Sequence, residues 1–159
     1  MTFGPAADRA EIEAIVRIFF AAFRSGPGLA ERMDALRALF LPEAVIIRTC
    51  GQPLAVYDVE SFIAPRAALL AGGSLREFSE WQEHGDTEVF GDIAQHFCSY
   101  AKAGVQDGTR FAGRGMKTLQ FVRTAAGWRI SAAAWDDERA ELRVDGDASS
   151  HQPADGPAS

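Results

Sequence analysis

The sequence predicts an α+β fold in which N-terminal helices cover one face of a strongly curved, mostly antiparallel sheet. Up to Gly72-Gly73, apolar residues recur mainly at helical spacing, with one short β-branched segment at 44–48. From Leu75 onward the pattern changes to the alternation that is typical of strands. Helices followed by a run of strands favour helices that gather on one side of an antiparallel sheet.

Two amphipathic helices are expected at the start of the chain. Asp8 followed by Glu11 resembles a capping box at a helix N-terminus. A turn at 25–28 ends the first helix, and a second apolar segment runs from Leu29 to Pro42. The apolar stripe of the first helix consists of Ile12, Ile15, Val16, Phe19, Phe20 and Phe23.

A short pair of strands and a third helix are expected next. Residues 44–48 and 54–57 are the two strands, with a Gly-Gln-Pro turn between them. Asp58 offers a cap for a third helix that closes at Gly72. Pro65 should break this helix or restart it at its own first turn.

The remaining chain predicts four long strands that end in a tight hairpin around the turn 124–127. If Arg123 faces Trp128 across this turn, one face of the hairpin is apolar, and Lys117 and Asp136 lie toward one end of that face. The same register places Met116 opposite Trp135 on the other, mostly polar face. We expect any chemistry near the two charges on the apolar face.

Length and composition indicate one domain. The chain has 159 residues, of which 47% are hydrophobic and 24% are charged, which is ordinary for a soluble globular protein. We expect a single domain over residues 1–140. Residues 141–159 are polar and rich in Gly, Pro and Ser, which predicts a disordered tail.

Several function classes are excluded at this stage. A net charge of −6 without a basic run argues against nucleic-acid binding. No apolar run approaches the roughly 20 residues needed to span a bilayer, and no secretory signal is visible, so we expect a cytoplasmic protein without membrane contact. Cys50 and Cys98 match no metal or redox spacing. We expect no metal and no cofactor.

The chain resembles the nuclear-transport-factor-2-like superfamily in its SnoaL-like branch. The resemblance covers about Asp8 to Arg139 and rests on the order of elements and on short segments at Phe90–Ala94, Tyr100, Gly113–Gly115, Leu119–Arg123, Gly127–Ile130 and Ala134–Glu138. It implies a cystatin-like cone with an internal pocket, and a homodimer. The superfamily includes isomerases, dehydratases, epoxide hydrolases, polyketide cyclases and binding modules, so its fold does not determine one function.

Extending the strand register predicts which side chains line the pocket. Asp136 is the candidate acid or base, because an apolar setting raises the pKa of a carboxylate; an ion pair between Asp136 and Lys117 at the rim, with no catalytic task, is the simpler interpretation. His96 and Tyr100 are further catalytic candidates, although a core histidine and a half-buried tyrosine are common. The expected ligand-binding residues are Trp81, Glu83, Cys98, Lys117, Leu119, Phe121, Trp128 and Ile130.

Two features keep this lining open to revision. A bulge in any strand would reverse the faces beyond it, and Glu80, Gln82 and His84 would then replace Glu83. Gly113 and Gly115 remove side chains from the middle of the concave face, which leaves room for a ligand or for strong bending of the sheet.

We interpret the protein as a binder of a small hydrophobic molecule, with cofactor-independent acid/base catalysis of the isomerase, dehydratase or cyclase type as the enzymatic hypothesis. The alternatives are ligand binding without turnover and a dimeric scaffold whose cone is filled by its own side chains. Met116 and Trp135 predict a homodimer through the convex face of the sheet.

Overall fold

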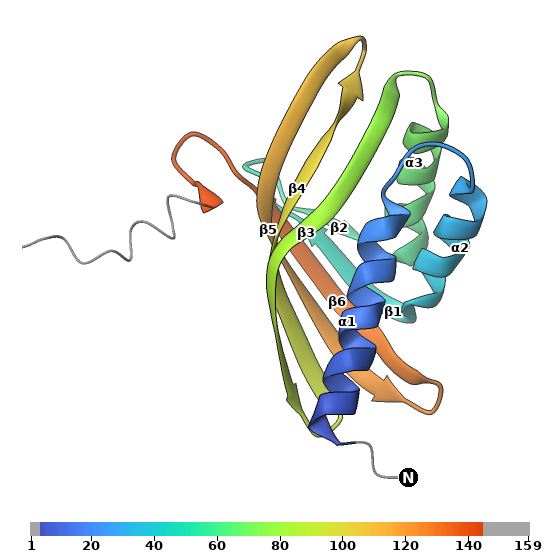
Figure 1. Ribbon diagram of the computed structural model, residues 1–159, viewed down its shortest axis with the longest axis vertical. Helices are drawn as coiled ribbons and strands as arrows, with labels where there is room; N and C mark the ends of the chain where they lie inside the picture. Colours follow the sequence, from blue (N-terminus) through green and yellow to red (C-terminus); the bar gives the residue numbers. More distant parts are fainter. Residues whose placement is uncertain (1–3, 145–159) are drawn as a thin grey trace, which may run out of the picture.

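The computed structural model describes residues 4–144. Three helices and six strands make up this part of the chain (Figure 1). In order they are α1 (Pro5–Ala22), α2 (Leu29–Ala38), β1 (Phe40–Arg48), β2 (Ala55–Tyr57), α3 (Val59–Ala71), β3 (Leu75–Phe90), β4 (Ile93–Gln106), β5 (Thr109–Thr124) and β6 (Gly127–Asp137).

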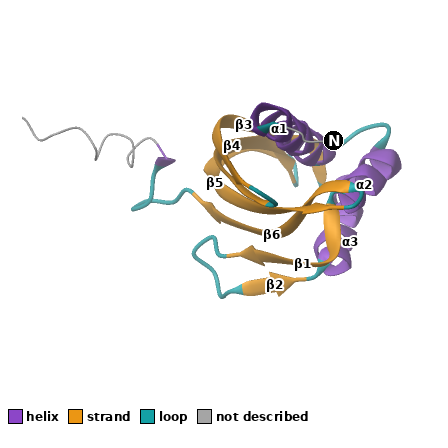
Figure 2. Ribbon diagram, turned by 90° about the horizontal axis from the view of Figure 1, so that it is seen from below, coloured by secondary structure: helices purple, strands orange, loops and turns teal. Residues whose placement is uncertain are grey.

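All six strands form one sheet in the order β2-β1-β6-β5-β4-β3. Neighbouring strands are antiparallel except β1 and β6, which are parallel. Figure 2 shows the sheet curving strongly, with α1 across its concave side and α2 and α3 beside β1. The predicted α+β class with a curved, mostly antiparallel sheet and N-terminal helices is confirmed.

The helices differ from the prediction at one cap and at Pro65. Helix α1 starts at Pro5, with Gly4 as its N-cap, so Asp8 lies inside the first turn and makes no capping box. Asp58 does cap α3, and its side chain and that of Ser61 form a reciprocal capping box. The predicted break at Pro65 is wrong, because α3 continues through this residue. Apolar residues of α3 before and after Pro65 are buried in the core.

The hairpin of β5 and β6 begins in the predicted register and then departs from it. Arg123 lies opposite Trp128, as expected, but Ser131 is an extra residue in β6, so that Gln120 lies opposite Ala132. Beyond this bulge every residue of β6 points to the face opposite to the predicted one. Trp135 and Asp137 therefore turn to the concave side.

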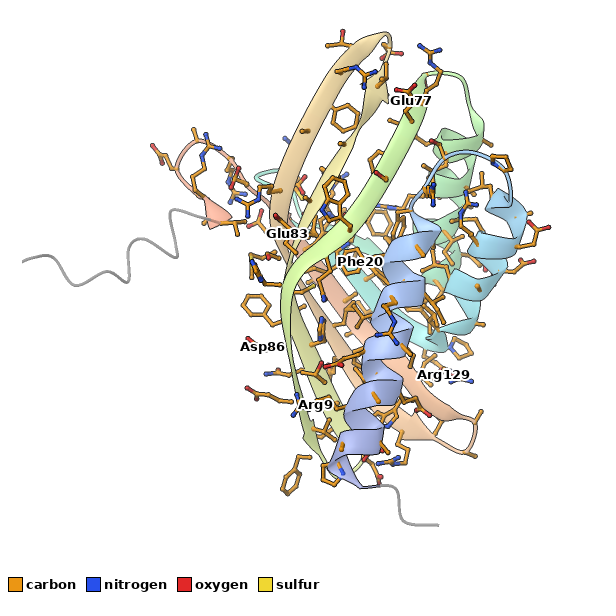
Figure 3. The ribbon with its side chains drawn as sticks, in the orientation of Figure 1. Arg9, Phe20, Glu77, Glu83, Asp86 and Arg129 are labelled. Carbon is orange, nitrogen blue, oxygen red and sulfur yellow. The ribbon has the colours of Figure 1, made fainter. Side chains whose placement is uncertain are left out.

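A second bulge lies in β3. Thr87 pairs with His96 as predicted, but the register shifts between Gln82 and His84, and Gln82 lies opposite Tyr100. Glu83 is the extra residue, and it points away from the helices (Figure 3). The alternative with a bulge in this strand is observed in part. Glu80 and Gln82 lie on the concave side, whereas His84, on the other side of the bulge, lies opposite Ser99 and stays outside.

The register between β4 and β5 is displaced by two residues from the prediction. The turn lies at Asp107-Gly108, and Lys117 pairs with Cys98 instead of His96. Because the side-chain period of a strand is two, this displacement leaves each side chain on its predicted face. The faces are therefore correct in β4 and β5 even though the partners are not.

One end of the cone is closed by a clamp between α1 and the hairpin of β5 and β6. Arg123 donates two hydrogen bonds of 2.9 Å to the carboxylate of Asp8, and its guanidinium lies 4.5 Å from the Trp128 ring centroid. The Trp128 indole also donates to Asp8, at 3.3 Å, and its backbone N–H donates to Glu11. The carboxylate thus joins the first turn of α1 to two strands more than 100 residues away in the chain.

The described part of the chain ends in a short turn after β6. Arg139 pairs with Leu142, and the backbone N–H of Val144 donates to Glu138 at 3.0 Å. The predicted disordered tail covered 141–159, and residues 145–159 lie outside the described residues. Within the described part, no helix has both the length and the apolar character that crossing a bilayer requires.

Asp8→Asn should destabilise the protein in a pH-dependent way. The hydrogen bonds from Arg123 hold the pKa of Asp8 below its ordinary value of 3.8. A lowered pKa means that the carboxylate stabilises the fold above that ordinary value and loses this effect as the pH falls further. In urea melts, the variant should have a lower free energy of unfolding than the wild type. This difference should be largest near pH 7 and should shrink below about pH 4.

The matched control is Asp34→Asn, because Asp34 pairs with Arg37 at 3.0 Å on the surface and its side chain is 79% exposed. That variant should unfold like the wild type at either pH. A loss for Asp8→Asn that is equal at all pH values would show that the charge of Asp8 contributes nothing.

Candidate functional site

A pocket of about 290 Å³ lies between α3 and the part of the sheet near the β4–β5 turn. Its walls are largely apolar and aromatic, and six charged side chains contribute to them. The apolar wall contains Phe23, Phe62, Leu69, Leu70, Leu75, Phe78, Phe111 and Trp135. The charged lining residues are Arg48, Arg66, Glu80, Lys102, Lys117 and Asp137. A largely apolar cavity with a few polar groups is typical of a small-molecule site.

The other half of the cone is filled by the protein's own side chains. Four of the expected ligand-binding residues lie there with no exposed surface, and they pack against α1 as part of the core: Leu119, Phe121, Trp128 and Ile130. Cys98, also expected to bind ligand, is 1% exposed in the same core. Burial raises the pKa of its thiol to about 12, which keeps it protonated at neutral pH.

Glu80 and Lys117 form a buried ion pair in the pocket wall. The Lys117 Nζ lies 3.5 Å from Glu80 Oε1, and the two side chains are 5% and 11% exposed, respectively. The ammonium is also surrounded by aromatic rings, with the centroids of Phe19 and Tyr100 both 4.8 Å away and Phe20 at 5.1 Å. These ring faces and the carboxylate together compensate the desolvated charge.

A second polar group joins Tyr100, Asp137 and Lys102. The Tyr100 hydroxyl donates to Asp137 Oδ1, and Lys102 Nζ lies 3.0 Å from Oδ2. Burial and the carboxylate raise the pKa of Tyr100, so the phenol stays protonated as a donor. Burial alone would raise the pKa of Asp137, but the hydrogen bonds from Tyr100 and Lys102 hold it below the ordinary value.

Gly115 makes room for the Tyr100 side chain. It lies opposite Tyr100 in the sheet, and a Cβ at this position would collide with the tyrosine hydroxyl. Gly113 lies opposite Lys102, and a Cβ there would come within 3.2 Å of Lys102 Cε. The space that these glycines leave on the concave face is therefore occupied by side chains of the site.

Two arginines complete the charged lining. The Arg66 guanidinium carbon lies 4.2 Å from the Phe62 ring centroid and 5.2 Å from that of Trp135, and Nη1 donates to the Phe62 carbonyl at 2.8 Å. The Arg48 Nε is buried and has no hydrogen-bond partner among the described residues.

Asp136 lies outside the pocket, and the expectation that it faces the concave side is wrong. The bulge at Ser131 turns it outward, where Arg139 lies 2.5 Å away and its hydrogen bond lowers the pKa of Asp136. The expected pair of Lys117 with Asp136 is therefore replaced by two separate pairs, with Glu80 and with Arg139.

His96 is held in the core, away from this pocket. Its Nδ1 lies 2.7 Å from the Thr87 hydroxyl and its Nε2 lies 2.5 Å from Gln82 Oε1, so both ring nitrogens have partners. Burial lowers the pKa of His96 and favours the neutral ring. Gly85 permits this arrangement, because a Cβ there would come within 2.6 Å of Nε2. The geometry is that of a structural histidine.

Trp81 and Glu83, both expected to bind ligand, lie outside the pocket. Trp81 is 43% exposed along a groove between α1 and β3, and Glu83 accepts a hydrogen bond of 2.7 Å from Arg114 on the outer face. The predicted patch of Met116 and Trp135 on the convex face is also wrong, because Met116 lies opposite Asp136 and Trp135 packs inward against Phe62.

Sequence reasoning missed most of the lining, including Arg48, Arg66, Lys102, Trp135 and Asp137. The bulge after Ile130 is the reason that Trp135 and Asp137 face the pocket in place of Asp136. It could not be foreseen, because no Gly marks that position in the sequence. Arg66 directly follows Pro65, which was expected to interrupt the helix. Among residues 4–144, no group of three or more His, Cys, Asp and Glu side chains is arranged to hold a metal ion.

Lys117→Met should strongly destabilise the protein, because it leaves Glu80 as an uncompensated charge in the wall. Breaking a buried pair in this way typically costs about 3–5 kcal/mol. Adding Glu80→Gln should recover part of the loss. The free energy of unfolding from denaturant melts is the measurement.

Lys102→Met is the comparison for this series, because the pair of Lys102 with Asp137 is partly open to solvent, with side chains 27% and 30% exposed. Lys102→Met should lower the free energy of unfolding clearly less than Lys117→Met does. Equal losses for the two lysine variants, or no recovery in the double variant, would contradict the assigned role of the buried pair.

Comparisons with known proteins concern the fold. No family model matches this sequence, and no curated protein matches it either. Solved structures do match. Kfla4162 protein from Kribbella flavida has a TM-score of 0.71 at 20% identity, over 86% of this chain and 94% of that one.

Two further structures are similar over most of their length. An NTF2-like protein with a cystatin-like fold from Novosphingobium aromaticivorans has a TM-score of 0.64 at 22% identity, over 87% of this chain and 88% of that one. The hexachlorocyclohexane dehydrochlorinase LinA, type 2, has a TM-score of 0.68 at 12% identity, over 84% of this chain and 87% of that one. The chain therefore has the NTF2-like, cystatin-like α+β fold that its sequence resembles.

Proposed function

We propose that the protein binds a small, mainly hydrophobic molecule in the pocket beside α3 and acts on it by acid/base chemistry without a cofactor. The observation that carries this proposal is the buried pair of Glu80 and Lys117 in the wall of an otherwise largely apolar cavity. A dehydrochlorinase and proteins described as a dehydratase and a ring hydroxylase share the fold, which supports small-molecule chemistry in such a cone.

Glu80 is the better placed of the two carboxylates to accept a proton from a ligand. Asp137 is held through both oxygens, by Tyr100 and by Lys102. Glu80 has one ion-pair partner among the described residues, Lys117 at 3.5 Å, which is longer than a strong charge-assisted hydrogen bond. A carboxylate that keeps an oxygen available beside the cavity meets the geometric requirement for a general base.

Lys117 would complement this base. When a carboxylate removes a proton from carbon, negative charge develops on the substrate, and a fixed ammonium next to the base stabilises that charge in a pocket that excludes water. The rings around Lys117 hold the ammonium in place without neutralising it. A carbon acid such as a small carbonyl compound is therefore the proposed substrate class, and the reaction would be an isomerisation or an elimination.

The alternative is that the protein binds a ligand without turning it over. The compound 5-nitrobenzisoxazole, used as a probe substrate, distinguishes catalysis from binding alone. A base that removes the ring C–H proton of this neutral, planar probe breaks its N–O bond and releases a coloured phenolate. The wild type should accelerate the reaction above buffer, and Glu80→Gln should reduce the rate by at least about tenfold, since a positioned base contributes roughly 10²–10⁴-fold.

Glu83→Gln is the matched control, because Glu83 lies in the same strand on the outer face and pairs with Arg114. Its rate should equal that of the wild type. A probe that binds, as seen by quenching of tryptophan fluorescence, but reacts no faster than in buffer would leave the protein as a binding module.

We also propose that the protein forms a homodimer through the convex face of the sheet. A hollow of about 480 Å³ lies there, and its lining is uncharged except for Glu88. Phe97, whose neighbour Thr118 lines the hollow, is 54% exposed. Two copies with a net charge of −6 each repel one another, so a nearly uncharged face is where they can approach at the lowest electrostatic cost.

Phe97→Lys should shift the protein from dimer to monomer in sedimentation velocity at micromolar concentration. Leu54→Lys is the control, because Leu54 is 65% exposed and lies in the loop before β2, away from the hollow. A wild-type protein that already sediments as a monomer would rule out this assembly.

A further inference from the structure

The charges in the pocket wall do not balance. Four cationic and two anionic side chains line the cavity. Each carboxylate is paired with a lysine, at 3.5 Å for Glu80 with Lys117 and at 3.0 Å for Asp137 with Lys102. Two arginines are left without a carboxylate partner among the residues that the structure describes, in a chain whose net charge is −6.

Arg66 projects from α3 into a set of rings instead of toward an acid. Its guanidinium carbon lies 4.2 Å from the Phe62 centroid, 5.1 Å from that of Tyr57 and 5.2 Å from that of Trp135. One of its N–H groups donates a hydrogen bond to the Phe62 carbonyl. A guanidinium has five N–H donors, so Arg66 can donate further hydrogen bonds to an acceptor bound in the pocket. Burial is the largest cause of the lowered pKa of Arg66, and the nearby positive charge of Arg48 adds to it, whereas Tyr57 and the charge of Glu80 oppose it.

Arg48 enters the pocket from the end of β1. It lies opposite Trp135 in the parallel pair with β6, which places its side chain on the concave face. Its Nε is buried without an acceptor among residues 4–144. A buried donor without a partner costs free energy, and two cations near one another in a cavity cost more. Both costs disappear when an acceptor with negative charge lies between the two side chains.

We infer that the pocket takes an organic anion, with its carboxylate held by Arg48 and Arg66 and its apolar body against the aromatic wall. Planar guanidinium groups match a carboxylate through paired N–H donors. The apolar lining excludes a bare inorganic ion as the intended ligand, because Phe62, Phe78 and Phe111 offer it no hydrogen bond. The ligand is therefore amphipathic, with one acidic end and a ring or short chain at the other.

This inference rests on the proposed function for the location of the pocket and adds the substrate class. In that arrangement the two arginines fix one end of the molecule, and the lysine and Glu80 contact another part of it. Positioning by a charged anchor contributes to catalysis only if the reacting carbon then lies beside the base. The anchor and the base are on different elements, so they can be tested separately.

The test compares 2-naphthoate with 2-naphthamide, which have the same ring system but differ in charge, by isothermal titration calorimetry. The wild type should bind 2-naphthoate at least about tenfold more tightly, because hydrogen bonds to a charged partner are stronger than neutral ones. Arg48→Gln should remove most of this preference, because it should weaken the binding of 2-naphthoate far more than that of 2-naphthamide. Arg37→Gln, at an exposed arginine that pairs with Glu60, should bind both compounds as the wild type does.

Each outcome decides one claim. Equal affinity of the wild type for the two compounds overturns the anion inference and leaves the pocket and the proposed function standing. A preference for 2-naphthoate that survives Arg48→Gln and also Arg66→Lys overturns the assignment to these two residues. Binding of neither compound counts against the pocket itself and thus against the proposed function as well. Melting curves of each variant show that it is folded before it is titrated.

Discussion

One extra residue in β6 determines which side chains of that strand line the pocket. Ser131 has no partner in β5, and because side chains alternate along a strand, the bulge exchanges the two faces of everything after it. Asp137 and Trp135 therefore line the pocket and Asp136 turns outward to Arg139. The Tyr100–Asp137 bond and the position of Trp135 against Phe62 depend on this single displacement.

The same concave face serves two purposes along its length. At the end closed by Asp8 and Arg123, its residues are fully buried and hold α1 against the sheet. Toward the β4–β5 turn the side chains become charged, and the glycines of β5 lie opposite the residues that need space, as Gly115 does for Tyr100. Close packing at one end thus supports a cavity with charged groups in its wall at the other, which is the arrangement that a positioned functional group requires.

Most of the fold could be predicted from the sequence, but most of the site could not. The change from helical spacing to alternation located the helices and strands, and the turn at 124–127 gave the hairpin register next to it. Errors began at the bulges at Glu83 and Ser131, because a one-residue insertion changes faces without leaving a Gly or Pro in the sequence. Lys117 and Tyr100 lie on the face that was predicted for them, because no bulge interrupts the pairing of β4 with β5.

The distribution of charge is the remaining argument that this cavity is more than a packing defect. The chain is acidic overall, yet its pocket holds more cations than anions, and one of these cations, Lys117, is almost fully withdrawn from water. Burying charge costs stability unless it is compensated, and apolar residues of the same volume would often serve the fold as well or better. Aromatic faces compensate Lys117 and Arg66 only in part, and the Arg48 Nε is not compensated by any described residue. Local features that weaken the fold without structural gain are typical of functional sites, and Lys117, Arg66 and Arg48 all line this one cavity.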